Sequence, residues 1–217
     1  MYSIYIIIVV VLAAAISTWI FFNYRPKKQI KVESLYTDAL NSMLQTDKRR
    51  AISLLKDVVK QDSEHVDAYL QLGNILRDEN PQQALKIHQM LTVRPNLSKL
   101  SKVEIYKSLA KDYEIMDNLI KAKKEAEQIL IIDKQNEWAI TFLLNIGEKI
   151  EDWDYAAEKA RQIQRISGVS DLNNLAKYLV YKSKEKIKNN AFGEAESLLN
   201  KAIKQAPEFG LPYKYLG

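Results

Sequence analysis

The chain has 217 residues, of which 47% are apolar and 27% charged, and its formal net charge is +5. It contains only six Gly and five Pro, which argues against a β-sandwich or a doubly wound sheet, since both need many tight loops. The absence of cysteine excludes a disulfide framework, a thiolate metal site and a cysteine nucleophile within these residues. With two histidines, a histidine-based metal site or triad has almost no ligands available.

Residues 1–22 form an uncharged apolar segment, MYSIYIIIVVVLAAAISTWIFF. A helix of this length rises about 33 Å, which is enough to cross the hydrocarbon core of a bilayer. Trp19 and Tyr24 stand near its C-terminal end, as expected for side chains at a membrane interface. We therefore expect an uncleaved transmembrane anchor. A cleaved signal peptide is the competing interpretation, but it would need a basic region before the apolar run, and none is present.

Basic residues follow the apolar segment within a linker expected over residues 23–31. Arg25, Lys27 and Lys28 lie just after the expected span, whereas no basic side chain precedes it. The positive-inside rule therefore predicts that the remainder of the chain faces the cytoplasm. The same cluster can also contact anionic lipid head groups, although a stop-transfer flank explains it equally simply.

Alanine recurs as a marker after residue 32, each time in a stretch that reads A-x-x-x-(apolar or Ala)-x-x-(apolar or Ala). The markers are Ala51, Ala84, Ala122, Ala156 and Ala195. Another small or apolar residue precedes most of them by twelve residues and follows several of them by 22. Together these steps give a period of about 34 residues, that of the tetratricopeptide repeat, a helix–turn–helix unit. The sequence thus predicts an all-α solenoid of helical hairpins behind the anchor.

Five repeats are expected over residues 32–209, and residues 210–217 begin an unfinished sixth. Their expected ranges are 32–65, 66–98, 103–136, 137–170 and 176–209. The extra residues in VRPNLSKLSK and SGVSDLNN are expected to form loops with helix caps. Because solenoids need a capping helix, we expect these residues to be the N-terminal part of a longer protein.

Capping logic places several helix ends. Asp152 is expected to precede the second helix of repeat four, and Asp171 the first helix of repeat five. Pro81 suits the first turn of a helix and Pro207 the position after one.

The first helix of each hairpin is expected to line a concave groove. If Gly73 and its equivalents are position eight, positions five, nine and twelve face into it. The candidate groove residues are Tyr36, Asn74, Arg77, Lys107, Lys111, Thr141, Asn145, Glu148 and Lys184. Lys, Arg and Asn side chains can bind carboxylates or backbone carbonyls of an extended peptide, but they suit an ordinary solvated helix face as well.

Other conspicuous side chains are expected to be structural. His88 lies in a second helix where a residue normally packs against a neighbour, so it is interpreted as a buried histidine rather than a ligand. Trp153 is expected to pack the turn of repeat four, and Tyr106 and Tyr113 to belong to the core. His65 carries no special signal.

No catalytic motif of the GxGxxG, GxxxxGK[ST], HExxH or GxSxG type is present. Paired carboxylates and calcium-loop spacing are also missing from the sequence. The mildly basic charge permits acidic partners without requiring nucleic acid. The sequence therefore offers no candidate catalytic residues.

Several segments in order carry a family resemblance: YTDALNSMLQTDKRRA, DAYLQLGNILRD followed by ALKIHQML, SLAKDY, and LLNIGEKIEDWDYAAEKA. Together with the apolar N-terminus and its basic flank, they resemble the lipopolysaccharide assembly protein B family of Gram-negative bacteria. LGNILR followed by IHQ is the most specific part, and it includes Asn74 and Arg77.

The resemblance implies a protein-binding adaptor in the bacterial inner membrane, with its repeats in the cytoplasm. It implies neither enzyme activity nor a small-molecule substrate. Such an adaptor would regulate lipopolysaccharide synthesis by bringing the lipid A pathway deacetylase to the membrane protease FtsH. Family members normally end in a rubredoxin-like metal-binding segment with two CxxC pairs. This chain has no cysteine, so no cofactor is expected within it.

Two alternatives stay open on the sequence. One is a generic tetratricopeptide interaction protein or envelope-assembly factor, which would be periplasmic if the apolar segment were cleaved. The other is the regulatory arm of an enzyme whose catalytic domain lies beyond Gly217. Two CxxC pairs beyond Gly217 would favour the adaptor, and a catalytic motif there would favour the enzyme.

Overall fold

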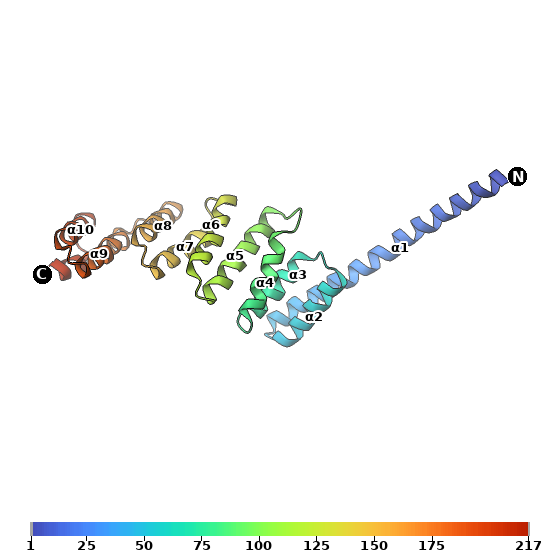
Figure 1. Cartoon of the computed structure of the whole chain (residues 1–217), viewed down its shortest axis with the longest axis horizontal. Coiled ribbons are helices and arrows are strands. Elements are labelled where there is room, and N and C mark those ends of the chain that lie inside the picture. Colours follow the sequence, from blue (N-terminus) through green and yellow to red (C-terminus); the bar gives the residue numbers. More distant parts are fainter. Residues whose placement is uncertain (1, 217) are drawn as a thin grey trace. The chain divides into compact units, whose positions relative to one another are not determined.

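The chain is α-helical throughout the part described by the structure, a computed structural model that covers residues 2–216 (Figure 1). Side chains at positions 3, 4, 21–28 and 30 lie outside this description. The helices are α1 Tyr2–Leu44, α2 Lys48–Gln61, α3 Val66–Leu76, α4 Pro81–Thr92, α5 Lys99–Ile115, α6 Leu119–Ile132, α7 Glu137–Lys149, α8 Trp153–Ser167, α9 Leu172–Lys188, α10 Phe192–Gln205 and α11 Gly210–Leu216.

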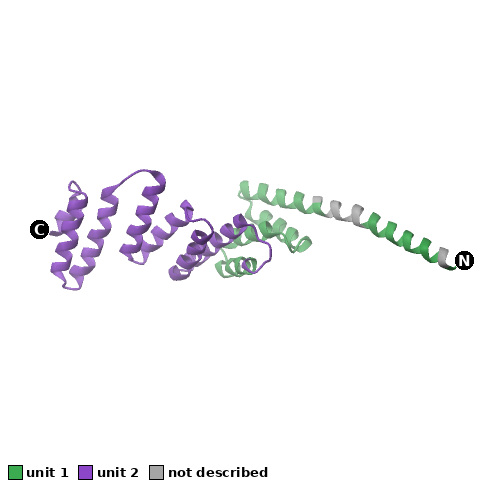
Figure 2. Cartoon of the chain, turned by 90° about the horizontal axis from the view of Figure 1, so that it is seen from above, with its two compact units in different colours: residues 1–91 green, residues 92–217 purple. Residues whose placement is uncertain are grey.

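The helices belong to two compact units, residues 1–91 and residues 92–217 (Figure 2). The first unit contains α1 to α4 and the second contains α5 to α11. Each has its own buried core. In the first unit, Val32 and Ala39 of α1 pack with Leu55 of α2 and Leu72 of α3.

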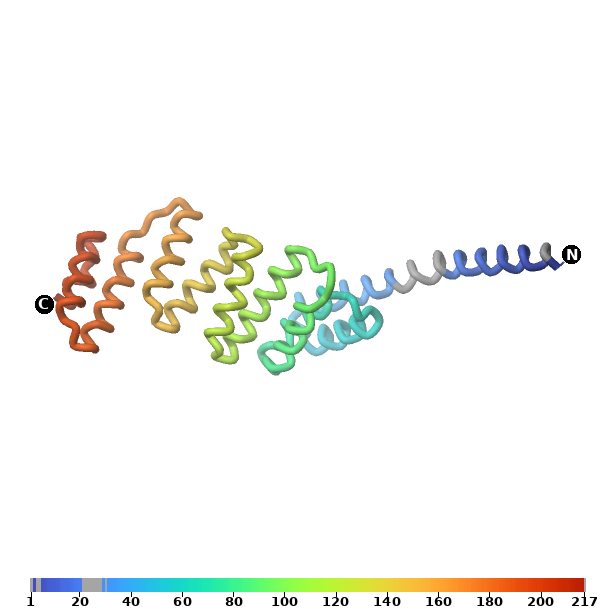
Figure 3. The backbone as a smooth tube through the Cα atoms, turned by 45° about the horizontal axis from the view of Figure 1, so that its top comes forward, coloured from blue at the N-terminus to red at the C-terminus, as the bar shows by residue number. Residues whose placement is uncertain are grey.

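Consecutive helices pair as antiparallel hairpins. In the second unit α5 packs on α6, α7 on α8 and α9 on α10, while α6 also contacts α7 and α8 contacts α9 (Figure 3). This arrangement confirms the prediction of an all-α, tetratricopeptide-like array. The exact division into five repeats stays a prediction.

The alanine markers hold the helices of each hairpin close together. Ala51, Ala84, Ala122 and Ala156 are completely buried, and Ala195 nearly so. A small side chain at these positions lets two helix backbones approach, and a larger one would overpack the contact. The recurring alanines are therefore the sequence signal of the hairpin contact itself.

Four hairpin turns share one backbone geometry. Thr46, Asp117, Glu151 and Asn190 each have a φ between 56° and 59°. In each turn the next residue donates its N–H to the carbonyl five residues earlier, as in Asp152 N–H to Gly147 O at 2.9 Å. This bond closes the preceding helix in the manner of a Schellman motif.

The residue after each left-handed position then starts the second helix. Asp47, Asn118 and Asp152 are N-caps whose side chains accept a hydrogen bond from the backbone N–H three residues later. The prediction for Asp152 is thus confirmed, as is that for Asp171 at the start of α9. Such caps are worth about 1 kcal/mol each.

The two insertions contain helix caps, as expected, but their loops are shorter than expected. Ser98 caps α5, which begins at Lys99, and Asp171 caps α9. The inserted residues therefore lengthen both helices to 17 residues and leave only short loops. Capping side chains at these positions start the helix earlier than a count of loop-forming residues suggests. Pro81 does begin α4, and Pro207 follows α10, as predicted.

Helix α1 runs without a break from Tyr2 to Leu44, so the expected linker over 23–31 falls within a helix. Met1 and the side chains at 3, 4, 21 and 22 of the expected anchor lie outside the described residues. Among the residues that are described, no helix has both the length and the apolar character needed to cross a membrane.

Candidate functional site

The first helices of the hairpins in the second unit, α5, α7 and α9, carry most of the candidate groove residues. Lys107 and Lys111 of α5 both reach the indole of Trp138 on α7, with their Nζ atoms 5.4 and 5.9 Å from the ring centroid. The Trp138 ring is itself stacked on Phe142 at 4.9 Å. The ammonium groups are attracted to the face of the indole ring. These residues therefore link α5 to α7 and form a positively charged aromatic surface.

Thr141 and Asn145 continue this surface along α7. They follow Trp138 by three and seven residues, which places all three on one face of the helix. Both side chains are exposed. A hydroxyl, an amide and an indole edge flanked by two ammonium groups can together hydrogen-bond an extended peptide and attract its carboxylates.

Glu148 connects α7 to α9. The Tyr178 hydroxyl donates a 2.6 Å hydrogen bond to Glu148 Oε1, and Lys177 Nζ lies 3.1 Å from the same oxygen. Burial, followed by this hydrogen bond, raises the pKa of Tyr178 above its ordinary value. Glu148 is thus held in a structural network and has little capacity left for a ligand.

Lys184 lies farther along α9. Its Nζ is 6.0 Å from the Tyr181 ring centroid and 5.5 Å from that of Tyr215 on α11. Lys184 therefore repeats, between α9 and α11, the combination of lysine and aromatic ring that Lys107 and Lys111 form with Trp138.

The candidates in the first unit are less open. Tyr36 is half-buried, with its ring centroid 4.7 Å from that of His65. Arg77 is only 9% exposed and donates from Nη2 to Asn74 Oδ1 at 2.6 Å. Arg77 and Asn74 thus brace one another at the C-terminal end of α3.

Both histidines have structural roles. His88 is completely buried, with Nε2 3.2 Å from the Leu70 carbonyl oxygen, as predicted for a packed histidine. His65 caps α3, and its Nδ1 accepts a hydrogen bond from Ala68 N–H at 3.2 Å. This role of His65 was not expected, because histidine is an uncommon N-cap.

The expectation of a structural role holds for Trp153 and Tyr113, whereas Tyr106 lies at the edge of the core rather than within it. Trp153 packs on Tyr181 with ring centroids 4.9 Å apart, and Tyr113 is buried. Tyr106 is half-buried and lines a hollow of about 270 Å³ between α5 and α6.

The structure brings together Lys107, Lys111, Thr141 and Asn145, and it places Glu148 and Lys184 on neighbouring helices. Trp138, at the centre of this surface, was missed. The sequence could have indicated Trp138, because it occupies position two of repeat four. That position also faces the groove, but only positions five, nine and twelve were considered.

Only one of the membrane-flanking candidates has a side chain that the structure describes. Trp19 is described and exposed on α1. The side chains of Tyr24, Arg25, Lys27 and Lys28 lie outside the described residues.

Comparison of sequences finds relatives with one shared name. Lipopolysaccharide assembly protein B of Haemophilus influenzae is 28% identical over 189 residues, which is 82% of this chain and 47% of the relative. The protein of the same name from Escherichia coli K12 is 23% identical over 167 residues, covering 76% of this chain and 43% of its own length. The chain therefore spans about half the length of these curated relatives. No protein-family model matches the chain.

Solved structures share the fold at low sequence identity. The crystal structure of MamA protein superposes with a TM-score of 0.57 at 18% identity, covering 82% of this chain and 93% of that one. YrrB, described as a TPR protein with an unusual peptide-binding site, has a TM-score of 0.57 at 14% identity, covering 92% and 96%. These likenesses concern the fold alone. Fold and sequence relatives together identify the chain as a tetratricopeptide-repeat protein similar to lipopolysaccharide assembly protein B.

Proposed function

We propose that the chain is a protein-binding adaptor in lipopolysaccharide assembly. The observation that carries this proposal is the match to relatives named lipopolysaccharide assembly protein B over 76–82% of the chain, on a tetratricopeptide architecture. Hairpin arrays of this kind present extended surfaces for other proteins.

The binding surface in this proposal is the face of α5 and α7 around Trp138. Lys107 and Lys111 give it positive charge, and Thr141 and Asn145 offer hydrogen bonds. An acidic segment with an aromatic or aliphatic side chain suits this chemistry, since its carboxylates would meet the ammonium groups and its apolar side chain the indole.

The finer proposal is that this adaptor acts at the inner membrane, with its repeats in the cytoplasm. Residues 1–22 carry no charge, and the described side chains of that segment, those of residues 2 and 5–20, are exposed along α1. The basic cluster after it supports the orientation. Tethering would raise the local concentration of a client beside a membrane protease, which we take to be the lipid A pathway deacetylase and FtsH.

Site-specific photo-crosslinking in cells tests the binding surface. A crosslinking residue at exposed Asn145 is expected to capture the deacetylase or FtsH, and Trp138→Ala is expected to reduce that capture about 10-fold, the effect of losing roughly 1.4 kcal/mol of binding energy. The control is the same crosslinker at exposed Glu196 on α10, outside this face. Equal capture from Asn145 and Glu196 would contradict the assigned surface.

Replacement of residues 1–22 tests the tether. An unrelated transmembrane helix in their place should preserve the regulated level of deacetylase, whereas deletion should abolish the regulation without unfolding the repeats. Normal deacetylase levels with a fully soluble variant would reject tethering while leaving the adaptor proposal intact.

A further inference from the structure

Helix ends in the second unit form two opposite rims, because its helices alternate in direction (Figure 3). One rim contains the N-terminal ends of α5, α7 and α9 and the C-terminal ends of α6, α8 and α10. We define it as the basic rim, made of residues 93–102, 131–138, 161–175 and 201–210. The other contains the hairpin turns, and we define it as the acidic rim, made of residues 114–121, 148–154 and 185–196.

The two rims have opposite charge. The basic residues of the basic rim are Arg94, Lys99, Lys102, Lys134, Arg161, Arg165, Lys201 and Lys204, and its acidic residues are Asp133, Glu137, Asp171 and Glu208. The acidic residues of the acidic rim are Glu114, Asp117, Glu148, Glu151, Asp152, Asp154, Glu185, Glu194 and Glu196, and its basic residues are Lys121, Lys149, Lys186 and Lys188. A net charge of about +5 for the whole chain therefore conceals a strong polarity across this unit.

Ion pairs compensate much of the acidic rim, whereas five of the cations on the basic rim make none within the part of the chain that the structure describes. On the acidic rim, Lys149 pairs with Glu114 at 2.5 Å and Lys186 with Glu194 at 2.7 Å. Lys182 reaches Asp154 there at 2.6 Å. Within the described residues, by contrast, the five basic side chains at the ends of α6, α8 and α10 make no ion pair: Lys134, Arg161, Arg165, Lys201 and Lys204.

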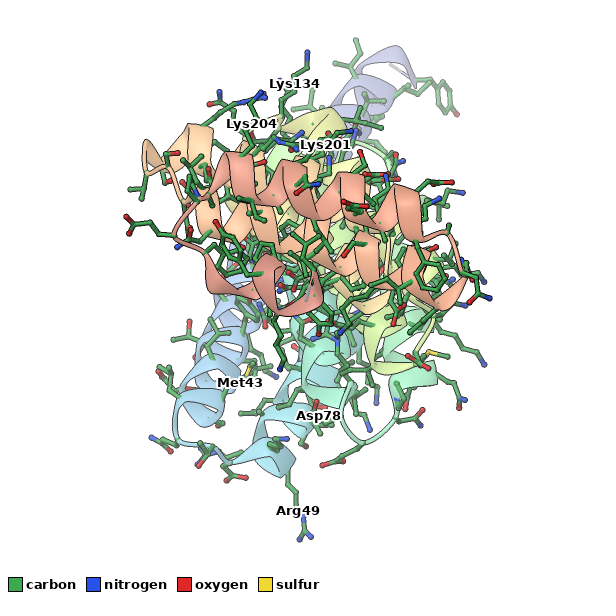
Figure 4. The ribbon with its side chains drawn as sticks, turned by 90° about the vertical axis from the view of Figure 1, so that its left-hand side faces the viewer. Met43, Arg49, Asp78, Lys134, Lys201 and Lys204 are labelled. Atoms are coloured by element: carbon green, nitrogen blue, oxygen red, sulfur yellow. The ribbon has the colours of Figure 1, made fainter. Side chains whose placement is uncertain are left out.

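Three of these five cations lie on one side of the unit (Figure 4). Viewed along the chain, Lys134, Lys201 and Lys204 project toward the same side (Figure 4). Arg161 and Arg165 line an open hollow of about 310 Å³ beside Gly168, and guanidinium groups bind phosphate through charge-assisted hydrogen bonds.

Large apolar side chains stand exposed among the cations of the basic rim. Leu100 is 73% exposed, Ile131 71% and Val169 66%. They come from three separate chain segments, at the start of α5, the end of α6 and the loop before α9. Cations interleaved with exposed aliphatic side chains are the combination that binds the interface of an anionic bilayer, through charge attraction and shallow apolar insertion.

We propose that the basic rim of the second unit contacts the head groups of an anionic membrane surface. The cations attract lipid phosphates, and Leu100, Ile131 and Val169 enter the boundary with the acyl chains. An acidic protein would satisfy the charges, but it would give no reason for aliphatic side chains exposed on three separate segments of this rim. The inference depends on the proposed function in one respect, because the proposed tether would hold the basic rim near the membrane.

Two matched positions allow a direct test, since the chain has no cysteine of its own. Ile131→Cys places a unique thiol on the basic rim, and Ile120→Cys places one on the acidic rim, where Ile120 is 69% exposed. Each full-length variant is labelled with a polarity-sensitive dye. It is then mixed with vesicles of phosphatidylcholine alone or of phosphatidylcholine with phosphatidylglycerol.

The expected result is a blue-shifted dye at position 131 only with phosphatidylglycerol, a shift that high salt reverses, and an unshifted dye at position 120. A dye at 131 that stays in water on anionic vesicles overturns the inference and leaves an acidic protein as the partner. Equal shifts at both positions also overturn it. Flotation of the protein with neutral vesicles measures insertion of the tether independently of the dye. A protein that does not float with them lacks the tether, whereas an unshifted dye on anionic vesicles shows that the basic rim does not bind.

Charge removal adds a second readout. Arg161→Gln with Arg165→Gln should weaken the dye response to phosphatidylglycerol by about five-fold per residue. Lys188→Gln, on the acidic rim, should leave it unchanged. All these side chains are exposed, and unaltered thermal melts would verify that the fold is kept. Equal weakening by Lys188→Gln would mean that net charge rather than the rim governs binding, and would overturn the inference.

Discussion

Gly73 shows how closely two helices of one hairpin approach. A Cβ added at this position would lie 2.9 Å from Cδ2 of the buried His88 ring and nearer still to other ring atoms. His88 cannot move away easily, since it is fully buried and bonded to the Leu70 carbonyl. The glycine of the LGN sequence is therefore required by its neighbour.

We predict that Gly73→Ala lowers the free energy of unfolding by about 1–3 kcal/mol through overpacking. The matched control is Gly193→Ala in α10, where an added Cβ meets no atom within 4 Å. That change should be neutral or stabilise by about 0.5–1 kcal/mol, as alanine favours the helix. Chemical denaturation of both variants checks the pair, and equal effects would refute this explanation of Gly73.

Tyr178 is expected to make stability depend on alkaline pH. Burial, then the hydrogen bond to Glu148, raises its pKa above the ordinary value of 10.0. The folded state therefore holds this proton more tightly than the unfolded state. Its contribution is complete below pH 10 and is lost as the pH rises above that value.

The melting temperature of the natural protein should accordingly fall as the pH is raised past 10, and that of Tyr178→Phe should fall less. At neutral pH the variant should be less stable by about 1 kcal/mol, because one hydrogen bond is lost. Thermal melts at a series of pH values give both curves. Parallel curves would show that Tyr178 does not carry the dependence. Tyr155, whose pKa is raised by burial and by Glu127 in the same way, remains in both proteins.

At the scale of the element, the hairpin turns reveal one helix that lacks its cap. Ala191 precedes α10 with φ −90° and ψ 61°, close to the values at Asn118, −92° and 69°. Asn118 accepts a hydrogen bond through its side chain, whereas Ala191 has no acceptor to offer.

Ala191→Asn should therefore stabilise the protein by about 1 kcal/mol, and Asn118→Ala should destabilise it by a similar amount. Denaturation of the two variants, with the natural protein as reference, measures both effects. A neutral Ala191→Asn beside a costly Asn118→Ala would mean that the geometry at Ala191 does not admit a capping bond.

The positions of the helices could be predicted from the sequence to a large extent, because the repeat is encoded by residues close together in the chain. Alanines at the hairpin contacts and acidic N-caps mark the helices directly, and Asp152, Asp171 and Pro81 were located correctly. The expected repeat ranges, which begin at residues 103 and 176, start later than α5 and α9 do, although Asp171 was correctly expected to precede α9.

The side-chain networks between elements could not be predicted in the same way. Trp138 between Lys107 and Lys111, or Tyr178 beneath Glu148, involves residues about 30 positions apart whose meeting depends on how two hairpins stack. A single sequence gives the face of a helix, but the partner of each side chain follows from packing.

At the scale of the whole molecule, the two units have separate cores, one of which includes Leu55 and Leu72 and another Ala156 and Tyr178. In arrays of hairpins, stability is close to a sum of local terms and contacts between neighbours. Damage to one hairpin should therefore stay local.

Ala156→Leu tests this expectation. Ala156 is completely buried, and an ideal Cβ on Gly147 would already lie 3.3 Å from its Cβ atom. The larger side chain should cost about 1–3 kcal/mol and speed amide hydrogen exchange in α7, α8 and α9. Exchange in α2 and α3 should be unchanged, and faster exchange across both units would show that they unfold together.

The four left-handed turn residues have a consequence for engineering. Thr46, Asp117, Glu151 and Asn190 all hold a backbone conformation that glycine adopts freely and that costs other residues about 1 kcal/mol or more. Threonine is the least suited of them, since its Cβ is branched. The free energy of unfolding of the natural protein could therefore be raised by substitutions in these turns. Glycine substitution at these four positions would give a more stable scaffold in which the Trp138 surface and the basic rim are unchanged.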